Sequence, residues 1–311
     1  MKLLTYSNQG HESTRLGAYE GSKIIDLIEA HRVLYDSEAP ESWFRSVSDL
    51  LRGGENALEY ASKVIADAQK AIKDNVENSR NFIREDNEVT YRPVVLGSPK
   101  ILCVAVNYAA HGAAQATKPP EEPYVFIKFP NMLIGHRSPI LLSKSSKKCD
   151  NEIELAVVIG KKGKYISRQK AMDYVAGYTI FNDFSFRDRR VNKSDPSRIN
   201  WLHLKNLDTA APIGPWLVTK NEIADPNHLK MKFQLNDSEQ ETGSTEDMVH
   251  KIPELIEYIS NGLTLEPGDV ISTGTPFSIG LGRERYLKDG DVVKAEIEGI
   301  GTLLNRVVSE E

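Results

Sequence analysis

Three acidic residues lie at the ends of two apolar segments and could together bind a cation. Glu152 and Glu154 flank the start of an apolar run that continues to Ile159, and Asp183 follows a second apolar segment, 178–181. Side chains two residues apart on a strand point to the same side, so Glu152 and Glu154 project together. Adjacent carboxylates repel each other, and burial increases that cost. A lysine or arginine, shared protons or a divalent metal ion must offset it.

The types of these residues indicate which metal they would bind. With no His or Cys beside the acids, the site suits Mg²⁺, Mn²⁺ or Ca²⁺ rather than zinc. The alternative is an exposed strand end with two solvated glutamates. A strand–helix–strand return is expected to bring Asp183 beside the glutamates. In that return, Ser167 would cap a short helix over residues 168–176.

Several segments, in the same order, resemble the metal-binding core of the fumarylacetoacetate hydrolase family. The resemblance covers residues 98–308. The segments are NYAAH at 107–111, EIELAVVIGK at 152–161, GYTIFNDFSFRD at 177–188, KNLDT at 205–209, APIGPW at 211–216 and TLEPGDVISTGTP at 264–276. The resemblance implies a mixed α/β, β-rich fold, with a β-sandwich roll as the large domain, and a homodimer.

The resemblance also implies roles for individual residues. Glu152, Glu154 and Asp183 would hold the metal, with Lys205 beside it to contact a developing enolate oxygen. His111 would be the general base, because an imidazole can exchange protons near neutral pH. The expected substrate-binding residues are Tyr108, Arg187 and Thr275, and an arginine can bind a carboxylate through two hydrogen bonds. Arg190 is also expected to bind substrate, on account of its charge and not through the resemblance.

Two positions depart from the family pattern. Ala114 stands where a glutamate usually orients the histidine, which puts water activation in doubt unless Glu121 or Glu122 substitutes for it. Arg190 stands where a glutamine is usual. A cation there indicates either a substrate with a second anionic end or an ion pair with Asp188.

The function implied is that of an enzyme acting on a 2-oxo or 2,4-dioxo acid through an enolate stabilised by the metal. Hydrolytic cleavage of a C–C bond in an acylpyruvate-like substrate is the leading prediction. One alternative is an isomerase or tautomerase of a hydroxymuconate-like diene acid, or an oxaloacetate decarboxylase. An alternative of another class is a catalytically silent protein that binds oxo acids.

Composition narrows the class of protein further. The net charge of −5 argues against a nucleic-acid partner. No apolar run has the ~20 residues needed to cross a membrane, and the two cysteines suggest neither a metal motif nor a disulfide framework. A cytoplasmic location is therefore expected. The small-molecule partner that the resemblance implies is an oxo acid.

The chain is expected to divide into a small N-terminal α+β domain with its linker, 1–95, and a metal-binding catalytic domain, 96–311. Apolar residues at spacings of three and four predict a helix over 55–72. Alternating residues predict strands at 230–235 and 291–298, and Pro253 is expected to open a helix. The polar stretch 75–88 has no periodicity and is interpreted as the linker.

Overall fold

The computed structural model describes residues 1–97, 100–109, 118, 120–191, 198–238, 241–276 and 285–311. His111 and Ala114, to which the sequence drew attention, lie outside the described residues. The mixed α/β, β-rich fold expected from the sequence is confirmed. Among the described residues, no helix is both long enough and apolar enough to cross a membrane.

The described α-helices are α1 (Leu27–Tyr35), α2 (Glu41–Phe44), α3 (Val47–Arg52), α4 (Gly54–Lys73), α6 (Trp201–Lys205) and α7 (Ile252–Ser260). The strands are β1 (Lys2–Asn8), β2 (Arg15–Glu20), β3 (Lys23–Asp26), β4 (Ile83–Glu85), β5 (Val89–Tyr91), β6 (Ile101–Ala105), β7 (Tyr124–Lys128), β8 (Leu133–Ile134), β9 (Ile140–Leu142), β10 (Cys149–Asp150), β11 (Ile153–Ile159), β12 (Val175–Asn182), β13 (Ser185–Phe186), β14 (Ala211–Thr219), β15 (Lys230–Leu235), β16 (Glu241–Ser244), β17 (Val270–Ser272), β18 (Val292–Ile297) and β19 (Gly301–Ser309). Short 3-10 helices are η1 (Ser79–Phe82), η2 (Asp86–Glu88), η3 (Pro130–Met132), η4 (Arg168–Tyr174), η5 (Arg187–Arg189), η6 (Lys220–Glu222) and η7 (Thr245–Asp247).

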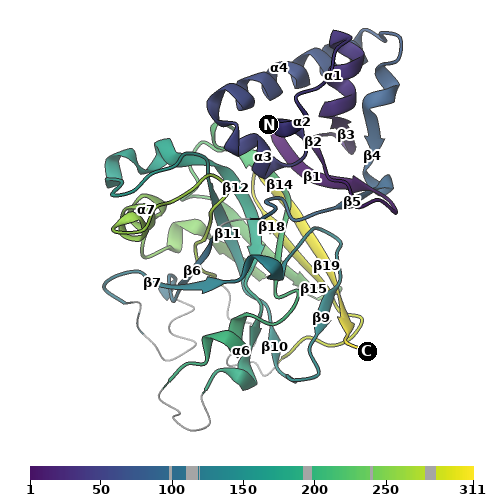
Figure 1. Cartoon of the computed structure of the whole chain (residues 1–311). Helices are drawn as coiled ribbons and strands as arrows, with labels where there is room; N and C mark the ends of the chain where they lie inside the picture. Colours follow the sequence, from purple (N-terminus) through teal and green to yellow (C-terminus); the bar gives the residue numbers. More distant parts are fainter. Residues whose placement is uncertain (98–99, 110–117, 119, 192–197, 239–240, 277–284) are drawn as a thin grey trace.

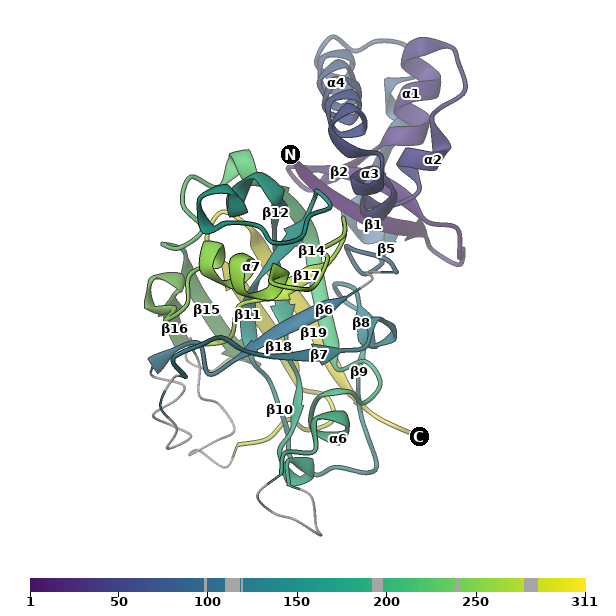
Figure 2. The same cartoon turned by 60° about the vertical axis from the view of Figure 1, so that its left-hand side comes forward.

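One 12-stranded sheet connects the N-terminal module with the rest of the chain. Its main order is β4-β3-β2-β1-β14-β12-β11-β17-β6-β7, and the antiparallel pairing of β1 with β14 makes the join. Figures 1 and 2 show helices α1 to α4 gathered at one end of the molecule, against β1–β3. The expected domain boundary near residue 95 stays a prediction.

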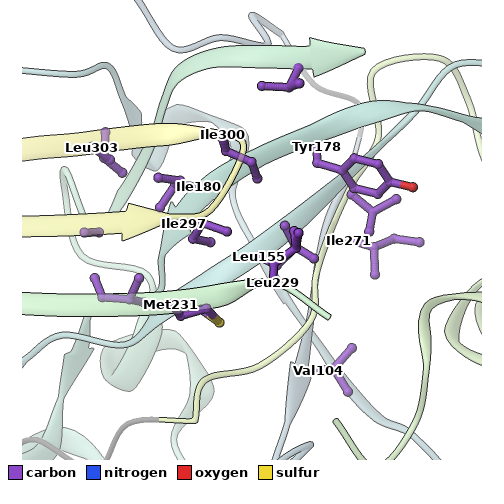
Figure 3. Close-up of a cluster of buried hydrophobic side chains, with 14 of the residues drawn as sticks. Val104, Leu155, Tyr178, Ile180, Leu229, Met231, Ile271, Ile297, Ile300 and Leu303 are labelled. Atoms are coloured by element: carbon purple, nitrogen blue, oxygen red, sulfur yellow. The ribbon is translucent and has the colours of Figure 1, made fainter. Parts of the chain in front are cut away.

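The central strand β11 is buried on both faces because two layers cover it. Leu155 and Val157 face a core shared with the five-stranded sheet β16-β15-β18-β19-β9. Ala156 and Val158, pointing the other way, belong to a second core that includes helices α1, α3 and α4. Figure 3 shows the first core, where Leu155 and side chains of the five-stranded sheet gather between the two sheets. This packing makes β11 a rigid support for the acids at its beginning.

Three local expectations from the sequence are wrong. Residues 75–88 are not a linker, because β4 pairs with β3 and η1 packs beside α1. The short helix expected over 168–176 is present as the 3-10 helix η4, Arg168–Tyr174, with Ser167 at its N-cap position. The expected cap is wrong, because the Ser167 side chain makes no capping hydrogen bond. The strands that η4 joins are antiparallel, so the return is a long hairpin rather than a strand–helix–strand crossover. The helix α4, the strands β15 and β18, and the helix α7 opened by proline are confirmed.

Candidate metal centre

The register of β11 and β12 brings the three acids together. Ile153 pairs with Asn182 in this antiparallel register, so the beginning of β11 lies against the end of β12. The Asp183 amide donates to the Glu152 carbonyl at 2.8 Å, which locks the two chain segments. Glu152, Glu154 and Asp183 are all buried, and each places a carboxylate oxygen within 4.8 Å of the others. The alternative of a solvated strand end is thereby excluded.

Glu154 is held from a third strand. Its Oε2 accepts hydrogen bonds from Ser272 Oγ at 2.6 Å and from the Gly274 amide at 2.8 Å. Gly274 has a φ of +90°, and a Cβ there would lie 3.0 Å from the Asn107 Cβ, so glycine suits this position. Burial, with the nearby charge of Asp183, raises the pKa of the Glu154 carboxyl well above its usual value, although the Ser272 hydrogen bond opposes this.

Two buried lysines compensate the acids. Lys205, from α6, donates to both Glu152 and Asp183. Lys128, at the end of β7, lies 2.9 Å from Asp183 Oδ1 and donates to the Phe184 carbonyl at 3.1 Å. Burial works to lower the pKa of Lys205, but the charges of Asp183 and Glu152 outweigh it and raise that pKa above its usual value. Lys205 is therefore an ammonium ion at neutral pH.

Arg187 completes the charged cluster together with an acid not predicted from the sequence. Its guanidinium donates to Glu152 and, at 2.8 Å, to Asp150 Oδ2. Burial raises the pKa of Asp150 to about 6, while the charge of Arg187 opposes the shift. Arg187 was expected to contact a substrate carboxylate. In this structure its guanidinium is engaged by two protein carboxylates, and the substrate contact stays a prediction.

The acids form the charged part of a pocket of about 180 Å³. Its charged lining comprises Lys118, Glu152, Glu154, Asp183, Arg187, Arg190 and Lys205. The other lining residues are Val104, Ala105, Val106, Pro120, Tyr124, Phe126, Ile199, Trp201, Leu204, Gly274 and Thr275. A small anion with a short apolar body matches such a lining.

Not every predicted site residue lies in this pocket. Arg190 and Thr275 line it, whereas Tyr108 is fully buried and is not part of the lining. Glu121 and Glu122, the possible substitutes for the missing glutamate, are exposed and line a separate groove beside α7. His111, which was expected to be the general base, lies outside the described part of the chain, so its role stays a prediction.

Sequence reasoning missed several residues that shape the site. Lys128 had a signal, since a lysine that ends an apolar strand needs a partner. Ser272 and the Gly274 amide gave none, because they reach Glu154 only through pairings between distant strands. Asp150 joins the cluster through its bond to Arg187. The buried Glu-Glu-Asp group with oxygen-only ligands fits a divalent metal ion.

The chain belongs to the fumarylacetoacetate hydrolase family, whose members are enzymes. The model of the fumarylacetoacetate (FAA) hydrolase C-terminal domain matches residues 100–308. A mitochondrial oxaloacetate tautomerase of Rattus norvegicus is 38% identical over 312 aligned residues, which cover 99% of this chain and 92% of the relative.

Two solved structures resemble the whole chain. A 5-carboxymethyl-2-hydroxymuconate delta-isomerase from Mycobacterium smegmatis has a TM-score of 0.71 at 28% identity and covers 100% of both chains. A maleylpyruvate hydrolase from Sphingobium sp. SYK-6, in complex with a manganese (II) ion and pyruvate, has a TM-score of 0.69 at 26% identity and also covers 100% of both chains. The manganese in this neighbour agrees with a divalent metal at the acidic cluster.

Proposed function

We propose that this protein is a divalent-metal-dependent tautomerase that converts the enol form of a 2-oxo dicarboxylic acid, oxaloacetate, to its keto form. The observation that carries the proposal is a pocket in which three buried carboxylates meet a protonated lysine. The similarity to an oxaloacetate tautomerase over nearly the full length of both chains supports the choice of substrate.

The residues present fit a metal ion by ligand type, and the acids in the cluster outnumber the cations. Asp150, Glu152, Glu154 and Asp183 are buried against Lys128, Lys205 and Arg187. If all are ionised, four negative charges face three positive ones. Glu152, Glu154 and Asp183 would hold Mg²⁺ or Mn²⁺. A bound ion of this kind supplies Lewis-acid polarisation of the substrate's 2-oxo oxygen.

Lys205 offsets negative charge on the substrate oxygen in this proposal. Its raised pKa keeps it cationic, so it stabilises the oxygen as a hydrogen-bond donor and does not serve as the base. During tautomerisation the enol oxygen loses one proton and carbon 3 gains one, so no water is consumed. We assign the proton transfer to His111, because an imidazole side chain in general can exchange protons near neutral pH.

Hydrolytic C–C cleavage of an acylpyruvate-like substrate is the second candidate, and the maleylpyruvate hydrolase neighbour favours it. Hydrolysis needs an oriented base for water. Glu121 and Glu122 are exposed and line another groove, not the pocket of the acidic cluster, and this position weakens the candidate. Oxaloacetate decarboxylation and isomerisation of a hydroxymuconate-like acid would use the same cluster.

The test follows the decay of enol oxaloacetate by ultraviolet absorbance. We expect Mg²⁺- or Mn²⁺-loaded protein to accelerate it and protein stripped with EDTA to lose that activity. Lys205→Met should lower kcat by about 10²–10³-fold, as removal of one preformed oxyanion donor does elsewhere. The exposed Lys170→Met is the matched control. Rapid acetylpyruvate cleavage without enol conversion would instead establish the hydrolase.

A further inference from the structure

Two arginines line the pocket, and among the described residues protein acids pair with Arg187 but not with Arg190. The Arg187 side chain is 7% exposed and pairs with Asp150 and Glu152. Arg190 is partly buried and lines the same pocket. Within the described part of the chain, its guanidinium makes no hydrogen bond or ion pair. An arginine in a pocket wall that no described acid engages is available to an anionic ligand.

The backbone of Arg190 is fixed to the element that carries Lys205. Its carbonyl accepts a hydrogen bond at 2.8 Å from the amide of Asn200, the residue that caps α6. The neighbouring bridge between Val191 and Ile199 ties the same two segments. Arg190 and Lys205 are therefore held on one support, and both contribute to the pocket lining.

Because much of the rest of the pocket wall is apolar, a substrate with two carboxylates needs a second cation in the pocket. Apolar side chains supply much of the wall, among them Ala105, Phe126, Ile199 and Leu204. A carboxylate buried against such a wall without a partner loses its hydration without compensation. Lys205 and Arg187 are already bonded to the acidic cluster. Of the other two cations in the lining, Lys118 is exposed and Arg190 is partly buried, so Arg190 is the one suited to a second carboxylate inside the pocket.

We propose that Arg190 binds the distal carboxylate of the substrate and so selects dicarboxylic over monocarboxylic 2-oxo acids. The inference rests on the proposed function for the placement of the oxo-acid end at the acidic cluster. Arg190 is a specificity-determining residue in this arrangement, and its planar guanidinium can donate two parallel hydrogen bonds to one carboxylate.

The experiment compares two stable probes with the same oxo-acid end, pyruvate and 2-oxoglutarate. Their affinities are measured by isothermal titration calorimetry on the full-length, Mg²⁺-loaded protein. Arg190→Gln should weaken 2-oxoglutarate binding by about 10–100-fold, as loss of a charged hydrogen bond does, and change pyruvate binding much less. Arg190→Lys should recover part of the loss because the charge remains. Arg189→Gln, in the same turn but outside the pocket lining, is the matched control.

The same variants are assayed with enol oxaloacetate, where Arg190→Gln should raise KM more than it lowers kcat. If wild-type protein prefers 2-oxoglutarate and Arg190→Gln abolishes the preference, the inference holds even where no tautomerase activity is found, and only the proposed function fails. If Arg190→Gln affects both probes equally, or neither, the inference is overturned whatever the tautomerase assay gives.

Discussion

At the scale of single residues, the site depends on how its buried charges are compensated. Asp183 lies between Lys128 and Lys205, and Glu152 lies between Lys205 and Arg187. Pairing of this kind stabilises a buried carboxylate only while each partner is present. Removing one cation therefore tests the cluster without touching a predicted metal ligand.

Lys128→Met provides that test. We expect the free energy of unfolding to fall by about 3 kcal/mol in EDTA, since breaking a buried pair leaves Asp183 undercompensated. Added Mg²⁺ should restore stability more in the variant than in wild type, because a bound cation replaces the missing charge. Thermal denaturation with and without Mg²⁺ measures both effects.

The control for this variant is Lys162→Met, which removes a lysine paired with Glu266 at the surface. Surface pairs of this type contribute about 0–1 kcal/mol. If Lys128→Met lowered the free energy of unfolding no more than the control does, or if Mg²⁺ stabilised both variants equally, Lys128 would not offset the negative charge of the cluster.

Strand spacing together with the family resemblance predicted the three acids and Lys205, but not Lys128 or Asp150. Glu152 and Glu154 follow from the period of two along a strand, and that period is a local property. Lys128 reaches Asp183 from a strand distant in the chain, and Asp150 is joined to the cluster by Arg187, so only the tertiary structure shows these pairings. The substrate roles of Tyr108 and Arg187 stay predictions, since one is buried outside the pocket lining and the other is paired with acids.

At the scale of elements, α6 positions Lys205 although it is too short to be stable alone. A helix of Trp201–Lys205 has few internal hydrogen bonds, and isolated helices of that length do not form in water. Its support comes from packing and capping. Phe126 stacks on Trp201 at 4.6 Å between ring centroids, and the Asn200 side chain accepts from the His203 amide at 3.3 Å.

Asn200→Ala should loosen α6 and disturb Lys205 indirectly. Loss of such a cap costs about 0.5–2 kcal/mol. Amide hydrogen exchange at the Leu204 amide, which donates to the Asn200 carbonyl, should become faster, with a lower kcat for enol oxaloacetate. Asn200→Asp keeps the capping acceptor and should restore both. If Asn200→Asp showed the same faster exchange and lower kcat as Asn200→Ala, capping would not be the role of Asn200.

Element prediction succeeded where a pattern was regular and failed where it was not. Strands β15 and β18 alternate between buried and partly buried residues, as their sequences indicated. Strand β4 has three residues, none of them buried, so its polar sequence resembled a linker. The direction of β12 relative to β11 was not predictable from the intervening residues, because a segment of that length can join parallel or antiparallel strands.

At the scale of the whole molecule, one contact region joins the N-terminal module, the large sheet and the five-stranded sheet. His136 Nδ1 accepts a hydrogen bond from the Leu304 amide of β19 at 3.1 Å. The His136 ring packs edge-on against the Tyr91 ring of β5, with 4.8 Å between the ring centroids. Arg137 bonds to Asp86 at 2.5 Å. These contacts all lie within the single chain. The expected homodimer and cytoplasmic location stay predictions.

Acid should weaken this junction through His136. Burial, with the charge of Arg137, lowers the pKa of His136 to about 4, and Asp86 only partly opposes this. Between pH 6.5 and pH 4 the unfolded chain binds a proton at this histidine and the folded chain does not. Stability therefore falls as the pH falls. Protonation would also remove the Nδ1 acceptor of the Leu304 amide.

The measurement is chemical denaturation of wild type and His136→Gln at a series of pH values from 7 to 4. A shift from 6.5 to about 4 corresponds to about 3 kcal/mol. Wild type should lose that much more stability than His136→Gln over this range, because glutamine does not titrate. His11→Gln, at an exposed position, should give a curve parallel to wild type. If the His136→Gln curve were also parallel to wild type, His136 would have an ordinary pKa and the junction would not be sensitive to acid.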